Sequence, residues 1–463
     1  MNLRRVGCLL VFGWLVGCQT LADRWSPEGG GQVVPESYRS ETSKRTGKIS
    51  DHWWRMFGDA TLNRLIKQLH DNNPDLMASL ARVDQSYAVL GQTRSGQWPT
   101  IRGDGAYEQH RDSVNTLLFP TTEREYDQYR LGVSTSWEID LWGKVRAGVE
   151  RDRLKAEAES ERYLNARLSL EANLVRQYLA WCSAHQELVI LQEAMSVRGD
   201  DLALQQARLE LGTGVEVDVT RSEVTLRTVE AAEEAGQRRV GMLEHAIAVL
   251  LGKAPSELER LSKPNQSLVL PEIPAGLPAA LLIQRPDLRV AEKELLAAGK
   301  EVGVRKVSFL PSISLTGSGG VASLKSGNLF HPGSTLFDIG PEVTVPLFQA
   351  GTRANVLASA RAEWNEAVAK YHSAILNAVR EVDDALLDLK SFSRELAIQN
   401  QALAAADQTS KIARLRQERG LASYFEVVEA ERDRLANARA ANTLKADVFG
   451  SVVRLIQALG GTW

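Results

Sequence analysis

The sequence predicts a mainly α-helical protein with a β-barrel part, built from two tandem copies of one structural unit. Three observations predict this fold class. Matching residues recur at a nearly constant offset, and long stretches without proline carry a helical period. Between them lie segments in which apolar and polar residues alternate. The offset defines the two copies, and the other two patterns identify the elements within each copy.

Residues 1–17 have the features of an export signal. Arg4 and Arg5 precede an apolar run that is shorter than the ~20 residues needed to span a bilayer. The run ends in Leu15-Val16-Gly17-Cys18, which resembles the bacterial lipobox, where the cysteine is acylated before cleavage. We therefore predict a covalent lipid on Cys18 that anchors the chain in a membrane. Gln19 after the cysteine favours, by resemblance to lipoproteins, the outer membrane.

Composition excludes several functional classes. The chain has 463 residues and a formal net charge of -3, without a dominant basic cluster, so we expect no nucleic-acid partner. The histidines show no metal-ligand spacing and no phosphate-binding loop is present, so we expect no metal, no cofactor beyond the lipid, and no enzymatic activity. With Cys8 removed and Cys18 acylated, Cys182 is left alone and an intramolecular disulfide cannot form.

An internal repeat organises the mature chain. Asn73-Pro74-Asp75-Leu76 recurs 212 residues later as Arg285-Pro286-Asp287-Leu288. Further on the offset becomes 208, and the four-residue difference falls between Ile101 and Gly132, where we expect a variable loop. The second offset pairs Gly132 with Gly340, Gly143 with Gly351, Gly212 with Gly420, and Glu223 with Glu431. We interpret the chain as a tandem duplication.

Each copy begins with a helix and continues with two strands. Pro74 and Pro286 suit the first turn of a helix, and Asn73 is a plausible N-cap. Period-two alternation then runs over 129–139 and 337–347, and more weakly after Thr100 and Ser312, so we expect four strands per chain.

The alternation fits both a β-sandwich and a membrane β-barrel with lipid outside and water inside. The export signal and lipobox favour the barrel. Four strands cannot close one, because membrane barrels begin at about eight strands, so closure requires several chains.

Long helices follow the strands in both copies. Gly212 lies 69 positions after Gly143, and Gly420 lies 69 positions after Gly351, with no proline between them, which corresponds to about 100 Å of helix in each case. The second stretch carries a heptad row from Ile375 to Ser410, which implies left-handed supercoiling against neighbouring helices. A soluble coiled coil accounts for these heptads but not for the strands.

Several motifs together resemble one family, the outer-membrane factors, which are the TolC-like exit ducts of tripartite efflux and type I secretion systems. The resemblance covers nearly all of the mature chain and rests on the ensemble of motifs. They are Trp53-Trp54, Phe57-Gly58-Asp59, Asn73-Pro74-Asp75-Leu76, Trp137-Glu138-Ile139-Asp140-Leu141-Trp142-Gly143, Arg285-Pro286-Asp287-Leu288, Phe309-Leu310-Pro311-Ser312, Pro346-Leu347-Phe348 and Glu381-Val382-Asp383-Asp384-Ala385-Leu386.

The resemblance implies a homotrimer with a twelve-stranded outer-membrane barrel that continues into a long α-helical periplasmic barrel. It implies two further partners, a periplasmic adaptor (membrane fusion) protein and an inner-membrane transporter. The lipobox favours the lipoprotein branch of efflux ducts for drugs, solvents or metal ions. The alternatives are a type I protein secretion duct and a lipidated periplasmic coiled-coil adaptor or scaffold.

With this resemblance the chain divides into five parts. These are a signal peptide (1–17), a lipidated N-terminal segment with an equatorial part (18–72), a first repeat (73–246), an equatorial connector (247–284) and a second repeat with the C-terminal end (285–463).

The resemblance also assigns two functional spots. The turns of the long hairpins match the family's adaptor-contacting tips, although a glycine C-cap alone would explain the glycines. These residues are Leu211, Gly212, Thr213, Arg419, Gly420 and Leu421.

Beyond the second turn, Glu426 and Glu429 match acidic residues of the family's periplasmic gate. Their spacing alone favours a solvated helix face, and the match to the family reverses that preference. This chain has Glu where the family leads one to expect Asp, and Arg221 is a candidate partner for the gate carboxylates.

Overall fold

The computed structural model describes residues 52–113, 115, 125–259, 261, 270–271, 282 and 284–461. The predicted signal peptide and Cys18 lie outside the described residues, as does much of the predicted connector. The chain forms two compact units, and each unit draws on both repeats. Among the described residues, the first unit holds 82–160 and 290–372, and the second holds 52–81, 161–289 and 373–461.

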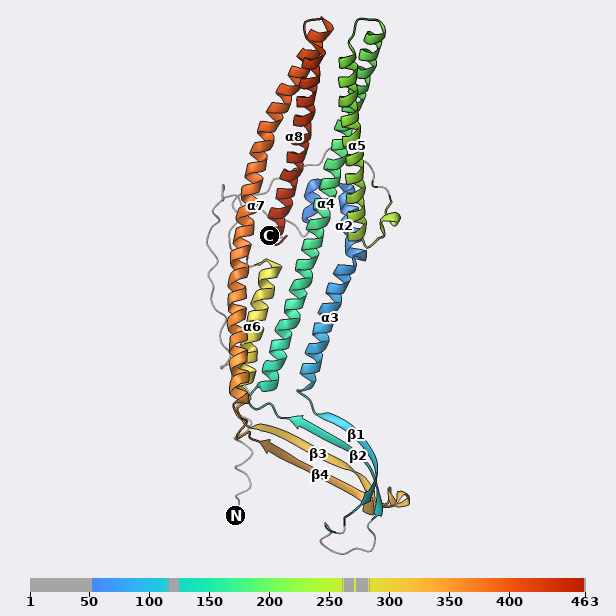
Figure 1. Ribbon diagram of the computed structural model, residues 1–463. Coiled ribbons are helices and arrows are strands. Elements are labelled where there is room, and N and C mark those ends of the chain that lie inside the picture. Colours follow the sequence, from blue (N-terminus) through green and yellow to red (C-terminus); the bar gives the residue numbers. More distant parts are fainter. Residues whose placement is uncertain are drawn as a thin grey trace. The chain divides into compact units, whose positions relative to one another are not determined.

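The first unit contains one antiparallel sheet of four strands in the order β1-β2-β3-β4, as Figure 1 shows. The predicted two strands per repeat are confirmed. The strands are β1 (Thr100–Arg111), β2 (Glu125–Glu138), β3 (Ser312–Ser323) and β4 (Thr335–Thr344). Within this chain β1 and β4 pair on one side only, so each leaves an open edge.

The strand register gathers the apolar side chains on one face of the sheet. Gly103 pairs with Val133, Leu131 with Val321, and Gly319 with Phe337, so odd-numbered residues share a face in every strand. Large apolar side chains on this face are exposed: Ile101, Tyr107, Leu131, Val133, Phe337, Ile339 and Val343. The opposite face is polar, with Ser134 donating to Asp104 at 2.8 Å and Ser318 donating to Asp338. Outward apolar and inward polar alternation is typical of barrel strands that face lipid.

The junction between β2 and the next helix explains the tryptophan-rich motif at 137–143. Asp140 accepts hydrogen bonds from the backbone N–H groups of Val145 (3.0 Å) and Arg146 (2.9 Å), which caps the helix start. Trp142 Nε1 donates to the Pro311 carbonyl at 2.6 Å. Gly143 has a φ of 80°, so this sharp bend favours glycine. The motif therefore joins strand to helix in the first unit.

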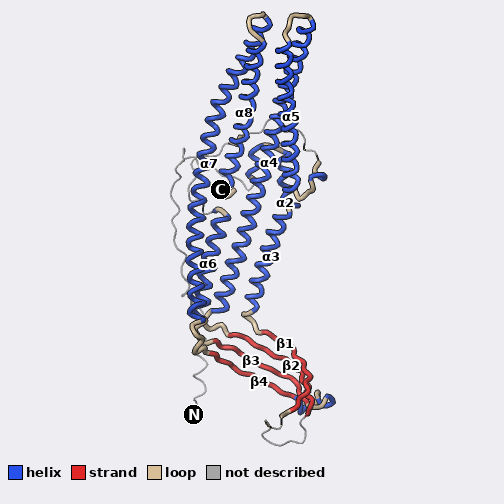
Figure 2. Tube along the Cα trace, in the orientation of Figure 1, coloured by secondary structure: helices blue, strands red, loops and turns tan. Residues whose placement is uncertain are grey.

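Helices make up most of the chain. Both long helices have 67 residues, about 100 Å each, which confirms the predicted proline-free helices. The helices are α2 (Ala60–Asn72), α3 (Pro74–Ser95), α4 (Lys144–Glu210), α5 (Glu216–Leu250), α6 (Pro286–Val307), α7 (Thr352–Glu418) and α8 (Tyr424–Ala458). Short 3-10 turns are η1 (Trp53–Phe57), η2 (Pro255–Glu257), η4 (Ser326–Asn328) and η5 (Pro332–Ser334). Figure 2 shows α4 with α5 and α7 with α8 as two hairpins.

The second unit has one main apolar core. Its buried members come from η1, α2, α4, α5 and α8, and the largest fully buried side chains include Trp53, Tyr178 and Trp181. Buried carboxylates are bonded within it. Asp59 caps α2 and accepts from the Tyr178 hydroxyl at 2.8 Å, and Glu171 accepts from Trp53 Nε1 at 3.3 Å. The N-terminal residues 53–69 are therefore an integral part of this unit.

Apolar packing decreases along the hairpins toward their turns. The main core extends along α4 to Leu188. A smaller cluster follows, made by Leu191, Ala194 and Val229. Nearest the second turn, three small or medium side chains of α7 and α8 remain: Ala413, Val427 and Ala430. The contacts between hairpins near the turns are therefore increasingly polar.

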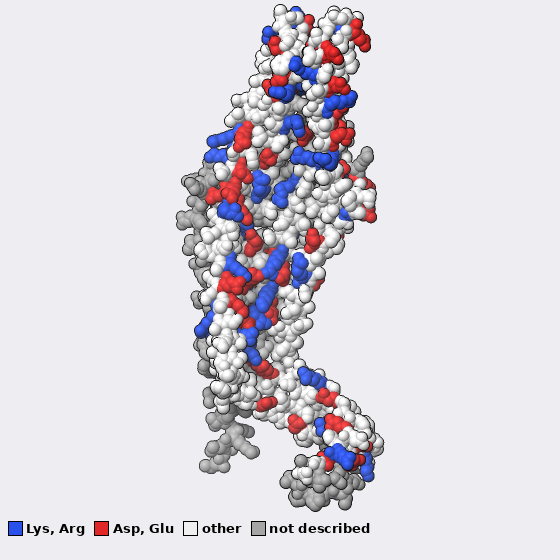
Figure 3. Space-filling view, viewed as in Figure 1, with Lys and Arg blue, Asp and Glu red and all other residues white. Residues whose placement is uncertain are grey.

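Charges of both signs lie along the helices on the face drawn in Figure 3, where acidic and basic side chains are interspersed. Among the described residues, none of the helices is both long and apolar enough to cross a bilayer.

Candidate functional site

The hairpin turns are fixed by glycines in the left-handed region. Gly212 has a φ of 71° and Gly420 a φ of 72°, while a Cβ at either position would meet no atom within 4 Å. The next backbone N–H groups close the turns: Thr213 donates to the Arg208 carbonyl at 2.9 Å and Leu421 to the Arg416 carbonyl at 2.8 Å. Glycine is therefore required here by conformation and not by lack of space.

Apolar side chains project from both turns. Leu211 is 78% exposed and Leu421 is 66% exposed, and Val215 and Val217 beside the first turn are also exposed. A soluble turn of this kind normally carries polar residues. Exposed apolar residues at the end of a hairpin are typical of a surface that contacts another protein.

Glu426 and Glu429 lie in the first turns of α8, and both are paired within the same chain. Glu426 is the third residue of a capping box with Ser423, and its Oε2 lies 3.3 Å from Arg416 Nη1. Glu429 Oε2 lies 2.7 Å from Arg432 Nη2. The side chains of both glutamates are about one-third to one-half exposed. Each predicted gate carboxylate therefore has a partner cation of its own.

Arg221 is not the partner of either glutamate in this structure. Its guanidinium lies over the ring of Phe425, 5.1 Å from the ring centroid. A buried hydrogen bond connects the two hairpins at the adjacent residues, where Ser222 Oγ and the Tyr424 hydroxyl are 2.8 Å apart. The hairpins are thus linked by residues that start α5 and α8.

Glu431 is a buried carboxylate that the sequence analysis did not assign to the site. It is 5% exposed and accepts hydrogen bonds from Ser410 (2.5 Å), Arg414 (2.8 Å) and Arg434 (3.0 Å). Burial would raise the pKa of this carboxyl, but these donors outweigh it and lower the pKa to about 2.

The pKa of Asp201 on α4 shifts in the opposite direction to that of Glu431. Burial raises its pKa, although Arg414 and Arg198 partly oppose the shift. One of its carboxylate oxygens, like one guanidinium nitrogen of Arg198, is buried without a hydrogen-bond partner. Unpaired buried groups of this kind are costly in free energy.

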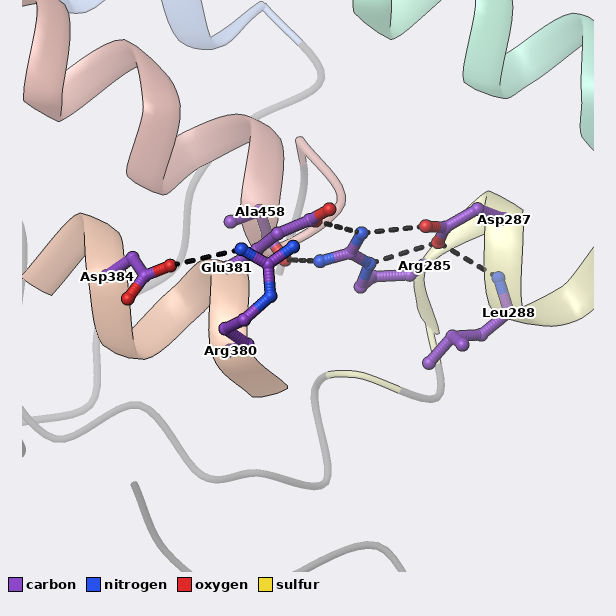
Figure 4. Close-up of polar contacts among 7 residues, drawn as sticks. All are labelled: Arg285, Asp287, Leu288, Arg380, Glu381, Asp384 and Ala458. Carbon is purple, nitrogen blue, oxygen red and sulfur yellow. Dashed lines mark hydrogen bonds and ion pairs between the residues drawn. The ribbon is translucent and has the colours of Figure 1, made fainter. Parts of the chain in front are cut away.

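At the other end of the hairpins, each repeat closes with the same contact. Asn73 Nδ2 donates to the carbonyl of Leu250, the last residue of α5, at 2.8 Å. Arg285 Nη1 donates to the carbonyl of Ala458, the last residue of α8, at 2.5 Å, as Figure 4 shows. Both donors directly precede the proline that starts a helix. Asn73 also accepts from the Leu76 N–H at 2.9 Å, which confirms it as the N-cap of α3.

Sequence signals for the missed residues were present. Ser410 is the polar last member of the heptad row of α7, and a polar residue in such a row often faces another buried polar group. Glu431 matches Glu223 by the repeat offset but is buried, whereas the Glu223 side chain is 55% exposed. In the described part of the chain, no group of three or more His, Cys, Asp or Glu could hold a metal ion.

A family model, curated relatives and solved structures all compare this chain with outer-membrane efflux proteins or outer-membrane channels. The family model described as "Outer membrane efflux protein" matches residues 65–253 and 277–461. The chain is 31% identical to the solvent efflux pump outer membrane protein SrpC of Pseudomonas putida over 99% of this chain and 96% of SrpC. It is 26% identical to the cation efflux system protein CusC of Escherichia coli, covering 97% and 96% of the two chains. The crystal structure of the Campylobacter jejuni CmeC outer membrane channel matches with a TM-score of 0.90 at 25% identity, over 94% of each chain.

Proposed function

Because the chain belongs to the outer membrane efflux protein family, we propose that three copies form an outer-membrane duct for small molecules, supplied by an inner-membrane transporter and a periplasmic adaptor. The cargo class is that of the relatives, drugs, solvents or metal ions. SrpC is named for solvent efflux and CusC for cation efflux, so one duct architecture serves different cargoes. Substrate choice therefore belongs to the transporter.

The observation that carries this proposal is the amphipathic sheet with open edges. One chain supplies four strands, and β1 and β4 leave their outer edges unpaired. Twelve strands from three copies would close a barrel, with the apolar face toward lipid and the polar face toward a water-filled lumen. The helices α4 and α7 begin shortly after β2 and β4, so helical walls follow directly from the barrel strands. A coiled-coil scaffold would not account for a sheet with one exposed apolar face.

Reconstitution tests the duct directly. Purified full-length protein in planar lipid bilayers is expected to give discrete single-channel currents, and an unrelated lipoprotein purified in the same way serves as the control. A strain lacking its own duct should regain solvent or drug tolerance when this protein is expressed with its transporter and adaptor. Absence of current and of restored tolerance would contradict the proposal.

Two further parts of the proposal rest on predicted residues. Cys18 carries a lipid that adds a second anchor to the barrel, so the Cys18→Ser variant should lose palmitate labelling and remain in the outer membrane. The two turns, with Gly212 and Gly420 at their centres, bind the adaptor, which is supported by the exposure of Leu211 and Leu421.

Glu426 and Glu429 face the periplasmic gate in this proposal. Their place next to the second turn and their partial exposure support it. Because Arg416 and Arg432 pair with them, the gate presents mixed charge, and its preference for cations is weaker than that of a ring of bare carboxylates.

A further inference from the structure

Arg285 joins three helices through one guanidinium group. It is 6% exposed and lies directly before α6. Its Nε and Nη2 atoms donate to the two carboxylate oxygens of Asp287 at 3.0 and 2.7 Å, and Nη1 donates to the Ala458 carbonyl at the end of α8. Nη2 also donates to Glu381 Oε2 on α7 at 2.7 Å. Figure 4 shows these three acceptors around the guanidinium.

The group is held charged at this buried position. Burial lowers the pKa of the Arg285 guanidinium, but hydrogen bonds and charge from Asp287 and Glu381 outweigh it and raise the pKa above its usual value. A planar guanidinium can satisfy several acceptors in fixed directions, which an ammonium or an amide cannot. The geometry therefore depends on arginine specifically.

Comparison of the two repeats shows which of the Arg285 contacts occurs in the second repeat and not in the first. In the first repeat Asn73 occupies the place of Arg285, and Leu250 that of Ala458, so both repeats join the start of a helix to the end of the return helix. Gly252 and Gly460, with φ of 69° and 92°, pack against Asn72 and Arg285 respectively. The repeat equivalent of Glu381 is Asn173, which carries no charge. The contact to the long helix is thus an addition of the second repeat.

The long helix of the second repeat has less apolar anchoring than that of the first. Among the described residues, α4 contributes Tyr178 and Trp181 to the main core, whereas α7 contributes no buried member and only the partly buried Leu389 packs against that core. Around Glu381, α7 buries small or medium side chains such as Ala378 and Val382. An ion pair at this position therefore carries a larger share of the anchoring.

The Arg285–Glu381 contact lies far from the α7–α8 turn, so a small change in the angle of α7 at Glu381 moves the turn by a large distance. From Glu381 to the end of α7 at Glu418 is 37 residues, or about 55 Å of helix. A tilt of about 6° at Glu381 would displace the far end of such a helix by about 6 Å. Glu426 and Glu429 follow directly after that end.

We propose that Arg285 is a positioning residue that sets the angle of α7 against α6 and α8 through Glu381, and so determines where the α7–α8 turn lies. This inference rests on the proposed duct function. When the Arg285–Glu381 contact is lost, the α7–α8 hairpin tilts at its root and the resting duct leaks. Asn73, the equivalent residue of the first repeat, contacts backbone groups only, namely the Leu250 carbonyl and the Leu76 N–H. It therefore does not set the angle of the long helix α4.

The test compares two single substitutions one helical turn apart. Glu381→Ala removes the contact to Arg285. Asp384→Ala removes the same charge from the same helix, where Asp384 pairs with Arg380 of its own helix at 3.4 Å. Single-channel recordings of the purified full-length proteins measure the open probability without adaptor or transporter. We expect about a tenfold rise for Glu381→Ala, equivalent to about 1.4 kcal/mol, and no change for Asp384→Ala.

Glu381→Gln provides the conservative rescue, because its amide oxygen still accepts a hydrogen bond from Arg285, and should lie between the alanine variant and the original protein. A spin label at Leu421→Cys reports the distances between turns in the trimer, which should broaden for Glu381→Ala alone. Equal leak and equal distances in the Glu381 and Asp384 variants would overturn the inference. Absence of current from the unsubstituted protein would instead refute the proposed duct.

Discussion

The two helical hairpins have equal dimensions but are anchored in different ways. Their long helices α4 and α7 have 67 residues each and their return helices α5 and α8 have 35. Trp181 on α4 is fully buried in the main core, whereas its repeat equivalent on α7, Leu389, is only partly buried beside it. The α7 helix buries smaller side chains such as Val382 outside that core, and it also makes ion pairs, among them Arg285 with Glu381 and Arg454 with Asp388.

The two copies of the duplication share their backbone features but differ in the side-chain contacts that anchor them. Both repeats have a glycine in the left-handed region at the turn, and both have a hydrogen bond from the residue before the proline to the last carbonyl of the return helix. Side chains at equivalent positions differ mainly in the long helices: α4 packs Trp181 into the main apolar core, whereas α7 is positioned in part by polar contacts such as Glu381 with Arg285. Hydrogen bonds and ion pairs can break and form again after a small movement of a helix. A close-packed apolar core resists such a movement, because its side chains interdigitate.

Trp181→Ala is the substitution with the largest expected effect on stability. Removing a fully buried tryptophan leaves a cavity and should cost about 3–5 kcal/mol. The equivalent change in the second repeat, Leu389→Ala, should cost clearly less, about 1–2 kcal/mol. Chemical or thermal unfolding of the detergent-extracted protein measures both. Equal losses would show that the two long helices are anchored alike.

Glu431→Gln should cost about 2–3 kcal/mol at neutral pH, because it removes a buried charge that accepts three hydrogen bonds. The pKa of Glu431 is lowered from 4.5 to about 2, so its contribution is complete above pH 4.5 and is lost as the pH falls toward 2. Unfolding of the two proteins should therefore differ at pH 7 and converge near pH 2.

The control for that pH series is the repeat equivalent, Glu223→Gln. The Glu223 side chain is 55% exposed and lies 3.9 Å from Arg227, so this change should leave stability nearly constant at every pH. A difference between the original protein and Glu431→Gln that persists at pH 2 would contradict the assignment to the carboxylate charge.

Bulky residues at the turns should impair efflux more than they impair folding. Gly212→Trp and Gly420→Trp strain the left-handed turn and enlarge the surface proposed to bind the adaptor. We expect a several-fold loss of solvent or drug tolerance with unchanged amounts of trimer. Gly241→Trp is the matched control, since this helical glycine also has open space around it. Undiminished tolerance in both turn variants would argue against docking at the turns.

The smallest expected effect concerns ion selectivity. Glu426→Ala combined with Glu429→Ala should modestly lower the cation preference of the open duct, because Arg416 and Arg432 already offset these carboxylates. Arg416→Ala should shift the preference toward cations. The equivalent residues of the first hairpin, Asp218 and Arg221, provide the control when both are changed to alanine. Reversal potentials in a salt gradient that are the same in all variants would place the constriction elsewhere.

Periodicity and repetition made most of the fold predictable from sequence. The duplication appears as a constant offset, the strands as alternation, and the long helices as proline-free heptads, since these patterns reflect backbone geometry directly. Gly212 and Gly420 could be assigned to turns because a left-handed residue at a helix end favours glycine.

Contacts between distant residues were harder to predict. Nothing in the local sequence shows that Arg285 meets Glu381 and the end of α8, although both motifs stood out, because the contact depends on how helices far apart in sequence pack. The partners of Glu426 and Glu429 were missed for a related reason. Arg416 lies on the other side of the turn, and its reach to Glu426 follows from the hairpin geometry.

Electron cryomicroscopy of the detergent-extracted protein would show whether three copies of the chain close one barrel. We expect three copies around one axis, with the open edge of β1 in one copy paired to the open edge of β4 in the next, closing a twelve-stranded barrel around a polar lumen. A monomer, or an assembly in which β1 and β4 of neighbouring copies do not pair, would contradict this expectation.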